Sequence, residues 1–234
     1  MSSTFHRARL IDREEVGGNL VLVSLQPEPG VRDSYARPGQ YVSVRADGAS
    51  SHFVLAGEVA ASRWQLLVRP GGTVANAIIA LPPDENVETT RAVGAGFPVA
   101  EARERPLLLA ATGSGIAAMR PVIHDRIDSH DAGNTWLYLG IRTQRDVPLA
   151  GELAEWRQKG VHVTVCLSRD AASSGDTVFA EGYVQDVARR RMAKSMSRAK
   201  GAMIFAAGVK EMIAGMRSLA LGLGIAETDV RTNY

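Results

Sequence analysis

The chain has 234 residues, enough for one large domain or two small ones, each with a proper core. Its hydrophobic content of 45%, charged content of 22% and net charge of +2 are ordinary for a soluble globular protein, and its scattered arginines argue against a nucleic-acid-binding protein. A single cysteine, Cys166, excludes a disulfide framework and a cysteine metal cluster.

The sequence also lacks the patterns of a membrane or secreted protein and of a metal-binding protein. No apolar run reaches the ~20 residues of a membrane helix, and the N-terminus has no apolar signal region, so we expect a cytoplasmic protein that does not bind a membrane. The histidines show no metal-ligand spacing, so no metal site is expected.

The first part of the chain, residues 5–99, predicts short strands separated by turns. Apolar and β-branched stretches, some of which alternate with period two, mark strands at 19–25, 41–45, 52–56 and 64–69. Glycine and proline pairs between them supply the backbone angles of chain reversals. One helix is expected at 74–81, ended by two prolines. Strands this short at this spacing predict an antiparallel sandwich or small barrel.

From residue 106 the pattern changes to alternating strands and helices. Strands are expected at 107–111, 136–139, 161–167 and 202–207, with a last short one from residue 230, and helices at about 116–128, 149–158, 183–200 and 210–223. This order predicts a parallel sheet with helices on both faces. The polar stretch 101–105 is the natural boundary, which gives domains of residues 1–101 and 102–234.

The turn after the strand at 107–111 carries the spacing of a dinucleotide fingerprint. Gly113-x-Gly115-x-x-Ala118 fits G-x-G-x-x-G/A, in which the first glycine makes a tight turn and the second admits a pyrophosphate. A helix beginning at such a turn offers free N–H groups and a positive end to phosphate. Thr112, Gly113, Ser114 and Gly115 are therefore candidate nucleotide ligands, and a plain strand-to-helix turn is the alternative.

Cationic and hydroxyl side chains follow the other strands of the predicted sheet. Arg142 follows the second strand, Ser168 and Arg169 follow the third, and Gly208 follows the fourth. Ligands bind beyond the carboxyl ends of such strands, and an acidic residue there would select NAD. Because arginine stands there instead, we expect NADP(H) to be favoured over NAD(H). Solvated loop charge is the alternative, and Asp170 is placed to neutralise Arg169.

The order of these pieces resembles the ferredoxin–NADP reductase superfamily over nearly the whole chain. The resembling segments are 38–41, 94–97, 112–117, 139–143, 182–185 and 208–212, the last of which is similar to a C-G-P-x-x-M motif with Ala207 in place of the cysteine. The resemblance implies an antiparallel Greek-key β-barrel that binds FAD, followed by an α/β domain that binds NAD(P). It also implies an NAD(P)H-dependent flavoprotein oxidoreductase that passes hydride from nicotinamide to FAD, and electrons onward to an unknown acceptor.

The resemblance implies two flavin-binding segments. The family's R-x-Y-S motif matches Ser51-His52-Phe53-Val54, which keeps the aromatic residue but lacks the arginine and the serine. The family's glycine-rich flavin loop matches residues 71–75, whose backbone at a helix start would hold phosphate. The candidate FAD contacts are His52, Phe53, Val54, Leu55, Gly71, Gly72, Thr73, Val74 and Ala75. Arg45 or Arg69 is a candidate source of the missing positive charge.

The final residue and one basic helix suggest further roles. Tyr234 resembles the terminal aromatic residue that stacks over flavin in plant-type members, and a frayed terminus is the alternative. The acceptor is expected to be a small molecule or an acidic ferredoxin-like or flavodoxin-like protein. Such a protein would dock near Arg189, Arg190 and Arg191, for which a solvated helix face is the alternative.

The incomplete flavin motif leaves a second function open. A chain that kept the fold and lost flavin would be a non-catalytic or regulatory nucleotide-binding protein. The missing arginine and serine at Ser51 and Val54 are the features that separate the two hypotheses.

Overall fold

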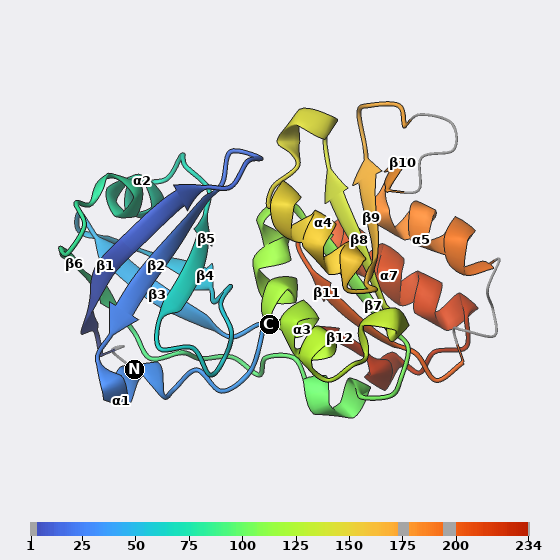
Figure 1. The fold of residues 1–234 in the computed structure, drawn as a ribbon, viewed down its shortest axis with the longest axis horizontal. Helices are drawn as coiled ribbons and strands as arrows, with labels where there is room; N and C mark the ends of the chain where they lie inside the picture. Colours follow the sequence, from blue (N-terminus) through green and yellow to red (C-terminus); the bar gives the residue numbers. More distant parts are fainter. Residues whose placement is uncertain (1–3, 173–177, 194–199, 234) are drawn as a thin grey trace.

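The computed structural model describes residues 4–172, 178–193 and 200–233. Figure 1 shows two bodies side by side, a β-barrel coloured blue to cyan and an α/β body coloured green to red. This confirms the predicted fold class. The boundary expected between residues 101 and 102 falls inside a short 3₁₀ helix, Val99–Ala102, which lies between the two sheets; the domain limits themselves stay a prediction.

The barrel is one antiparallel sheet of six strands in the order β4-β3-β6-β1-β2-β5. The strands are β1 (His6–Glu15), β2 (Val21–Pro27), β3 (Tyr41–Ala46), β4 (Ala49–Val54), β5 (Trp64–Val68) and β6 (Asn86–Thr89). A bridge between Leu55 and Leu66 brings the two edges together and closes the sheet. Asp47 and Gly48, with φ of 49° and 73°, form the two-residue turn that joins β3 to β4.

Two helices belong to the barrel, α1 (Pro29–Arg32) and α2 (Thr73–Ala80). The prediction of a helix at 74–81 is confirmed. α2 packs against β3 and β4, and its apolar residues Val74, Ala75 and Ile78 enter the barrel core. Burial of this face holds a helix that is too short to be stable alone.

The α/β domain is a parallel sheet of six strands in the order β10-β9-β8-β7-β11-β12. The strands are β7 (Leu107–Thr112), β8 (Thr135–Ile141), β9 (His162–Leu167), β10 (Phe179–Glu181), β11 (Met203–Ala207) and β12 (Val230–Thr232). The chain runs from β7 to one edge and then returns to β11 on the other side of β7. The strand order therefore reverses beside β7, the place where such sheets bind ligands.

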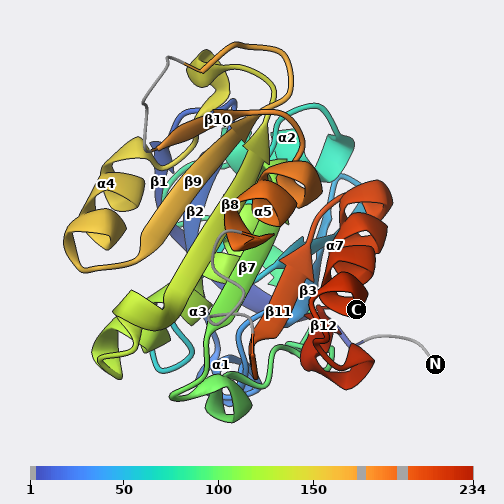
Figure 2. The same cartoon turned by 90° about the vertical axis from the view of Figure 1, so that its right-hand side faces the viewer.

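Helices cover both faces of this sheet, as predicted. α3 (Ile116–Asp128) and α4 (Ala150–Gln158) lie on the face toward the barrel, while α5 (Val184–Ala193) and α7 (Lys210–Gly222) cover the other face (Figures 1 and 2). The helix predicted at 183–200 is described as far as residue 193, and residues 194–199 lie outside the described part. No helix in the described part of the chain is long and apolar enough to cross a membrane.

The two domains share one apolar cluster and one buried arginine. Phe97, after the barrel, stacks on Phe205 of β11 with ring centroids 4.7 Å apart. Arg120 of α3 is 9% exposed and donates to the Ala56 carbonyl of the barrel at 2.9 Å. The same guanidinium pairs with Glu152 of α4 at 2.6 Å. These contacts fix the barrel edge near β5 against the α/β domain.

A second buried arginine anchors the connection between the domains. Arg126 of α3 is fully buried and donates to the Ala102 carbonyl at 2.6 Å and to the Arg105 carbonyl at 2.9 Å. Its charge is balanced by the Asp131 carboxylate at 3.0 Å. A buried charge is tolerated only when it is paired and hydrogen-bonded. The connecting segment is therefore held against α3.

Candidate nucleotide site between the two domains

A cavity of about 880 Å³ opens where the carboxyl ends of the parallel strands meet the barrel. Its lining comes from the turn after β7, the ends of β8 and β9, the starts of α5 and α7, and two loops of the barrel. Five of the predicted nucleotide ligands line it: Thr112, Gly113, Ser114, Arg142 and Ser168. Cavities of this size hold cofactors.

The glycine turn presents backbone donors to this cavity. Gly113 has a φ of +53°, so it makes the tight turn that the sequence predicts. A 3₁₀ turn, Gly113–Gly115, then leads into α3, and neither element has a side-chain cap. Uncapped N–H groups at a helix start favour an anionic ligand such as phosphate.

Gly115 and Gly208 have a packing role that the sequence does not predict. The sequence predicts that Gly115 admits a pyrophosphate, whereas a Cβ atom there would lie 2.4 Å from the Ala207 carbonyl oxygen of β11. At Gly208, where φ is +140°, a Cβ atom would lie 2.0 Å from the Thr112 hydroxyl oxygen. That hydroxyl instead accepts a hydrogen bond from the Val209 N–H at 3.0 Å. Both glycines let the ends of β7 and β11 converge.

The two predicted 2′-phosphate arginines lie on neighbouring strand ends. The Arg169 N–H donates to the Arg142 carbonyl at 2.9 Å, and both side chains are exposed. Within the described residues neither guanidinium has an ion-pair partner. Asp170 forms no ion pair with Arg169 among the described residues, and its carboxylate accepts a hydrogen bond from the Gln144 N–H at 2.8 Å. The rim of the cavity is therefore positive here.

The acidic residue that follows β8 also accepts hydrogen bonds from its own loop. Asp146 lines the cavity, and its carboxylate accepts hydrogen bonds from the Thr143 N–H at 3.1 Å and the Thr143 hydroxyl at 2.9 Å. A carboxylate held in this capping box is turned toward its own loop. Both bonds go to Oδ2, so Oδ1 accepts no hydrogen bond from the described residues.

Several residues that line the cavity were not identified as nucleotide ligands from the sequence. Arg69, which follows β5, donates to the Gly18 carbonyl at 3.3 Å and lies 3.4 Å from where a Cβ atom of Gly113 would be. Tyr183 and Val209 line the cavity although they are 62% and 54% exposed. No local pattern marks Arg69, because the barrel is brought to the glycine turn only by tertiary packing.

Neither candidate arginine is placed at the flavin loop. Arg69 lies at the nucleotide turn, and Arg45 forms a bidentate pair with Glu88 at 2.7 and 2.8 Å. Cys166 is buried, as predicted, and also lines the nucleotide cavity. Burial raises the pKa of this thiol to about 12, so it stays protonated at neutral pH.

The first predicted flavin segment has its side chains on two faces of β4. His52 lies on the outer face, 5.3 Å from the Tyr41 ring and 2.8 Å from the Ser43 hydroxyl. Phe53 packs against the barrel core, and Leu55 is fully buried there. Val54 packs against the cluster shared by the two domains. The outer aromatic face is therefore formed by His52 and Tyr41 and not by Phe53.

The second predicted flavin segment presents mainly backbone. Val74 and Ala75 are buried in the barrel core, so their side chains face away from a ligand. Gly71, with a φ of +124°, and Gly72 have no atom within 4 Å of an added Cβ. Thr73 is exposed, and α2 has no side-chain cap. The open N–H groups of this helix start are suited to phosphate.

Two further predictions concern the chain end and the basic helix. Tyr234 lies outside the described residues, but the preceding Asn233 lies against Gly39 and Gly94 of the barrel. In α5, Arg189 pairs with Asp186 at 3.3 Å and Arg190 donates to the Glu181 carbonyl at 2.8 Å. These contacts hold the arginines against their own domain, and the docking of an acidic protein stays a prediction.

Comparison with known proteins gives matches along the whole chain. Residues 109–218 match the family model of the oxidoreductase NAD-binding domain. The fruit protein pKIWI502 of Actinidia deliciosa is 24% identical over 226 residues, which cover 90% of this chain and 70% of that protein.

Three solved structures have the same fold. The cytochrome P450 reductase of Amycolatopsis has a TM-score of 0.80 and 20% identity, over 100% of this chain and 71% of its own. The FAD/NAD-binding domain of a Vibrio cholerae nitric oxide dioxygenase has a TM-score of 0.80 and 17% identity, over 97% of both chains. A Neisseria gonorrhoeae ferredoxin NADP⁺ reductase with bound FAD and NADP has a TM-score of 0.77 and 12% identity, over 100% of both. The predicted resemblance to the ferredoxin–NADP reductase superfamily is confirmed as a likeness of fold.

The packing role of Gly115 gives a testable prediction. In Gly115→Ala the added Cβ would collide with the Ala207 carbonyl, so we expect the free energy of unfolding to fall by about 1–3 kcal/mol. The displaced turn should also bind NADP⁺ more weakly. Urea denaturation and a nucleotide titration measure the two effects.

Gly151 of α4 provides the matched control, since an added Cβ there has no atom within 4 Å. Gly151→Ala should leave nucleotide binding unchanged and keep or raise stability, because alanine favours the helix. Wild-type stability in Gly115→Ala would contradict the packing role.

Proposed function

We propose that this chain, with its ferredoxin–NADP reductase fold and its NAD-binding domain, is an NAD(P)H-dependent flavoprotein oxidoreductase that passes electrons to a separate acceptor. The observation that carries the proposal is the cavity at the strand-order reversal, which is lined by an uncapped glycine turn and by Arg69 and Arg142, with Arg169 beside Arg142 on the neighbouring strand end. None of these three arginines has an ion-pair partner among the described residues. This donor set fits a dinucleotide with several phosphate charges.

Each part of the cavity suits one part of such a ligand. The N–H groups at Gly113 and Ser114, with Arg69 opposite, would hold the pyrophosphate. The exposed ring of Tyr183 offers a flat surface for the adenine base. The pyrophosphate would then be held by both domains, because Arg69 belongs to the barrel and the glycine turn to the α/β domain.

The cavity favours NADP(H) over NAD(H). Arg142, Ser168 and Arg169 stand together on adjacent strand ends, where a 2′-phosphate would accept their hydrogen bonds. Asp146 and Asp170, the nearby acids, hydrogen-bond to loop backbone. A site that binds the ribose hydroxyl of NAD would need such an acid to be available.

Flavin would be held by the outer face of β3 and β4 and by the start of α2. Tyr41 and His52 supply an aromatic surface, and the backbone at Gly72 and Thr73 supplies phosphate donors. When bound, the nicotinamide supplies a hydride and the flavin accepts it and releases electrons to the acceptor. The protein holds and orients both groups.

A flavin-free nucleotide-binding protein is the second candidate. It is favoured by Ser51 in place of an arginine and by the packing of Phe53 against the barrel core. In that case the cavity would still bind NADP(H), and the barrel would serve only to complete it.

Flavin reconstitution separates the two candidates. The purified protein is incubated with FAD or FMN, freed of excess flavin and examined by visible absorption under anaerobic conditions. We expect a bound flavin band that NADPH bleaches within the dead time of manual mixing. Protein that retains neither flavin would contradict the oxidoreductase and support the flavin-free candidate.

The nucleotide assignment predicts two different affinity patterns. Arg169→Gln should weaken NADPH binding by about tenfold or more and leave NADH binding unchanged, since it removes a charge-assisted bond to the 2′-phosphate. Arg69→Gln should weaken both by a similar factor, since both nucleotides carry the pyrophosphate. Isothermal titration of each variant with each nucleotide measures this.

Arg145→Gln is the matched control, because Arg145 is an exposed arginine of the 3₁₀ turn Gln144–Asp146, whereas Arg169 follows β9 beside Arg142. It should bind both nucleotides as the wild type does. Equal weakening of NADPH and NADH by Arg169→Gln would exclude the 2′-phosphate role.

A further inference from the structure

The turn that joins β1 to β2 extends from the barrel toward the α/β domain (Figure 1). It consists of Gly17, Gly18 and Asn19, whose φ angles are 79°, 59° and 54°. Glycine and asparagine adopt this left-handed backbone most readily, so the sequence suits the turn. Gly18 and Asn19 also line the nucleotide cavity. The turn is therefore a part of the barrel that faces the candidate site.

The two glycines of this turn pack against the backbone of the loop that follows β8. A Cβ atom on Gly17 would lie 2.7 Å from the Val147 carbonyl oxygen, and one on Gly18 would lie 2.5 Å from the Asp146 carbonyl oxygen. Real Cβ atoms do not approach other atoms so closely, so a side chain at either position would push the turn away. The close approach of the two domains at this point therefore requires glycine.

A hydrogen bond between the two domains lies beside these glycines. The Leu149 N–H donates to the Val16 carbonyl at 2.6 Å. Leu149 is 4% exposed and has a φ of 55°, a conformation that a leucine keeps only where its surroundings fix it. Val16 packs against the apolar cluster shared by the two domains, to which Leu149 belongs. The turn is therefore held on the α/β domain by a hydrogen bond and by apolar packing.

Arg69 of the barrel connects this turn to the glycine turn of the α/β domain. Its Nη1 atom donates to the Gly18 carbonyl at 3.3 Å. Its Nη2 atom lies 3.4 Å from where a Cβ atom of Gly113 would be. Arg69 is exposed, and a long exposed side chain samples many rotamers unless a contact restrains it. The Gly18 carbonyl supplies such a restraint at the cavity.

We propose that the turn at Gly17 and Gly18 positions Arg69 for nucleotide binding, with Gly18 as the positioning residue. The loop at Asp146 fixes the turn, and the Gly18 carbonyl then holds Arg69 over the glycine turn at Gly113. A guanidinium has five N–H donors, so Arg69 keeps donors for an anion after it has bonded the carbonyl. This role rests on the proposed function, because the anion is the pyrophosphate of NAD(P)H.

Gly18→Ala tests the positioning role. The added Cβ would overlap the Asp146 carbonyl, so the turn should move and its own carbonyl should leave Arg69. We expect NADPH and NADH each to bind about tenfold more weakly, as in Arg69→Gln, because both nucleotides carry the pyrophosphate. Isothermal titration measures these affinities, and circular dichroism verifies folding.

A double variant separates the positioning of Arg69 from general damage to the turn. If Gly18 acts through Arg69, the two single substitutions remove the same interaction. Gly18→Ala should then weaken binding by no more than about twofold in an Arg69→Gln background. General damage would instead weaken binding by the same factor in both backgrounds.

Arg69→Lys tests the same contact without altering the turn. A lysine keeps the charge, but its single nitrogen cannot bond the Gly18 carbonyl and also reach the glycine turn as the two nitrogens of Arg69 do. We expect NADPH to bind about tenfold more weakly to this variant than to the wild type. Arg69→Lys therefore carries the test if Gly18→Ala does not fold.

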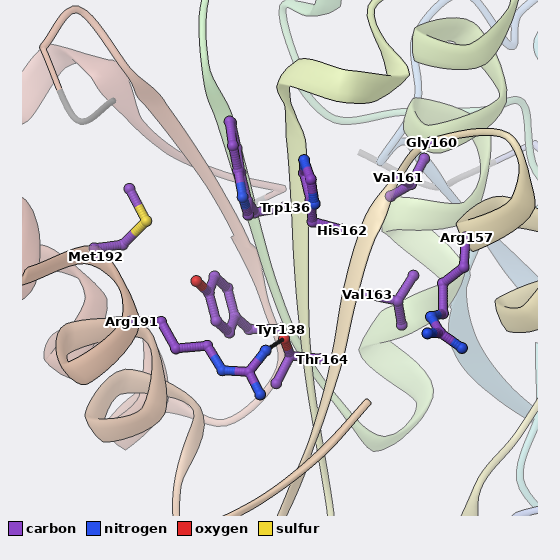
Figure 3. Close-up of a pocket in the computed structure, with 10 residues that line it drawn as sticks. All are labelled: Trp136, Tyr138, Arg157, Gly160, Val161, His162, Val163, Thr164, Arg191 and Met192. Carbon is purple, nitrogen blue, oxygen red and sulfur yellow. Dashed lines mark hydrogen bonds between the residues drawn. The ribbon is translucent and has the colours of Figure 1, made fainter. Parts of the chain in front are cut away.

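Two control variants should bind NADPH as the wild type does. Gly48→Ala places alanine at a φ of 73° in the turn between β3 and β4, where an added Cβ has no atom within 4 Å. Arg157→Gln removes an exposed arginine from a second cavity, of about 500 Å³, at the starts of β8 and β9 (Figure 3). The described residues that line the two cavities are all different. Weaker binding in Arg157→Gln would place the nucleotide in the second cavity and overturn the proposal.

Three further results would overturn the role of Gly18 alone, because the wild type would still bind the nucleotide. They are wild-type affinity in folded Gly18→Ala, equal losses in the two backgrounds of the double variant, and wild-type affinity in Arg69→Lys. A wild-type chain that binds neither NADPH nor NADH would contradict the proposed function itself, and the positioning role with it.

Discussion

The nucleotide cavity depends on how closely the ends of β7 and β11 approach each other. The missing side chains at Gly115 and Gly208 allow this approach, because a Cβ atom at either position would overlap the facing strand. The Thr112 hydroxyl then bonds the Val209 N–H and joins the two strand ends. The glycine turn can therefore present its N–H groups beside the place where the strand order reverses.

The barrel completes this cavity because it is fixed to the α/β domain. Arg120 reaches the Ala56 carbonyl and the Gln65 side-chain oxygen, and Phe97 stacks on Phe205. These contacts set the position of the β5 end, from which Arg69 extends to the glycine turn. The positive charge opposite the turn is thus supplied by the other domain, and a dinucleotide there would bridge the two.

Local sequence patterns predicted the strands and helices of the α/β domain and the glycine turn. The α/β strands and helices follow from buried apolar runs and helical periodicity, and the turn at Gly113 follows from its spacing. β1 and β6 were not recognised individually, because β1 buries only Ala8 and Leu10 among ten residues and β6 has four residues. The position of Arg69 at the glycine turn and the inward packing of Phe53 depend on tertiary contacts, so no local pattern contains them. The packing role of Gly115 against Ala207 also depends on a tertiary contact, and the fingerprint does not suggest it.

The central claim is that an NADP(H) molecule lies between the two domains, in contact with both. Hydrogen–deuterium exchange with and without NADPH tests it directly, because backbone amides that contact or are covered by the nucleotide exchange more slowly. We predict slower exchange at residues 113–116, 142–143 and 168–169, and also in the barrel at residues 18–19 and 69–72. Protection confined to the α/β domain, or absent from the glycine turn, would contradict the claim.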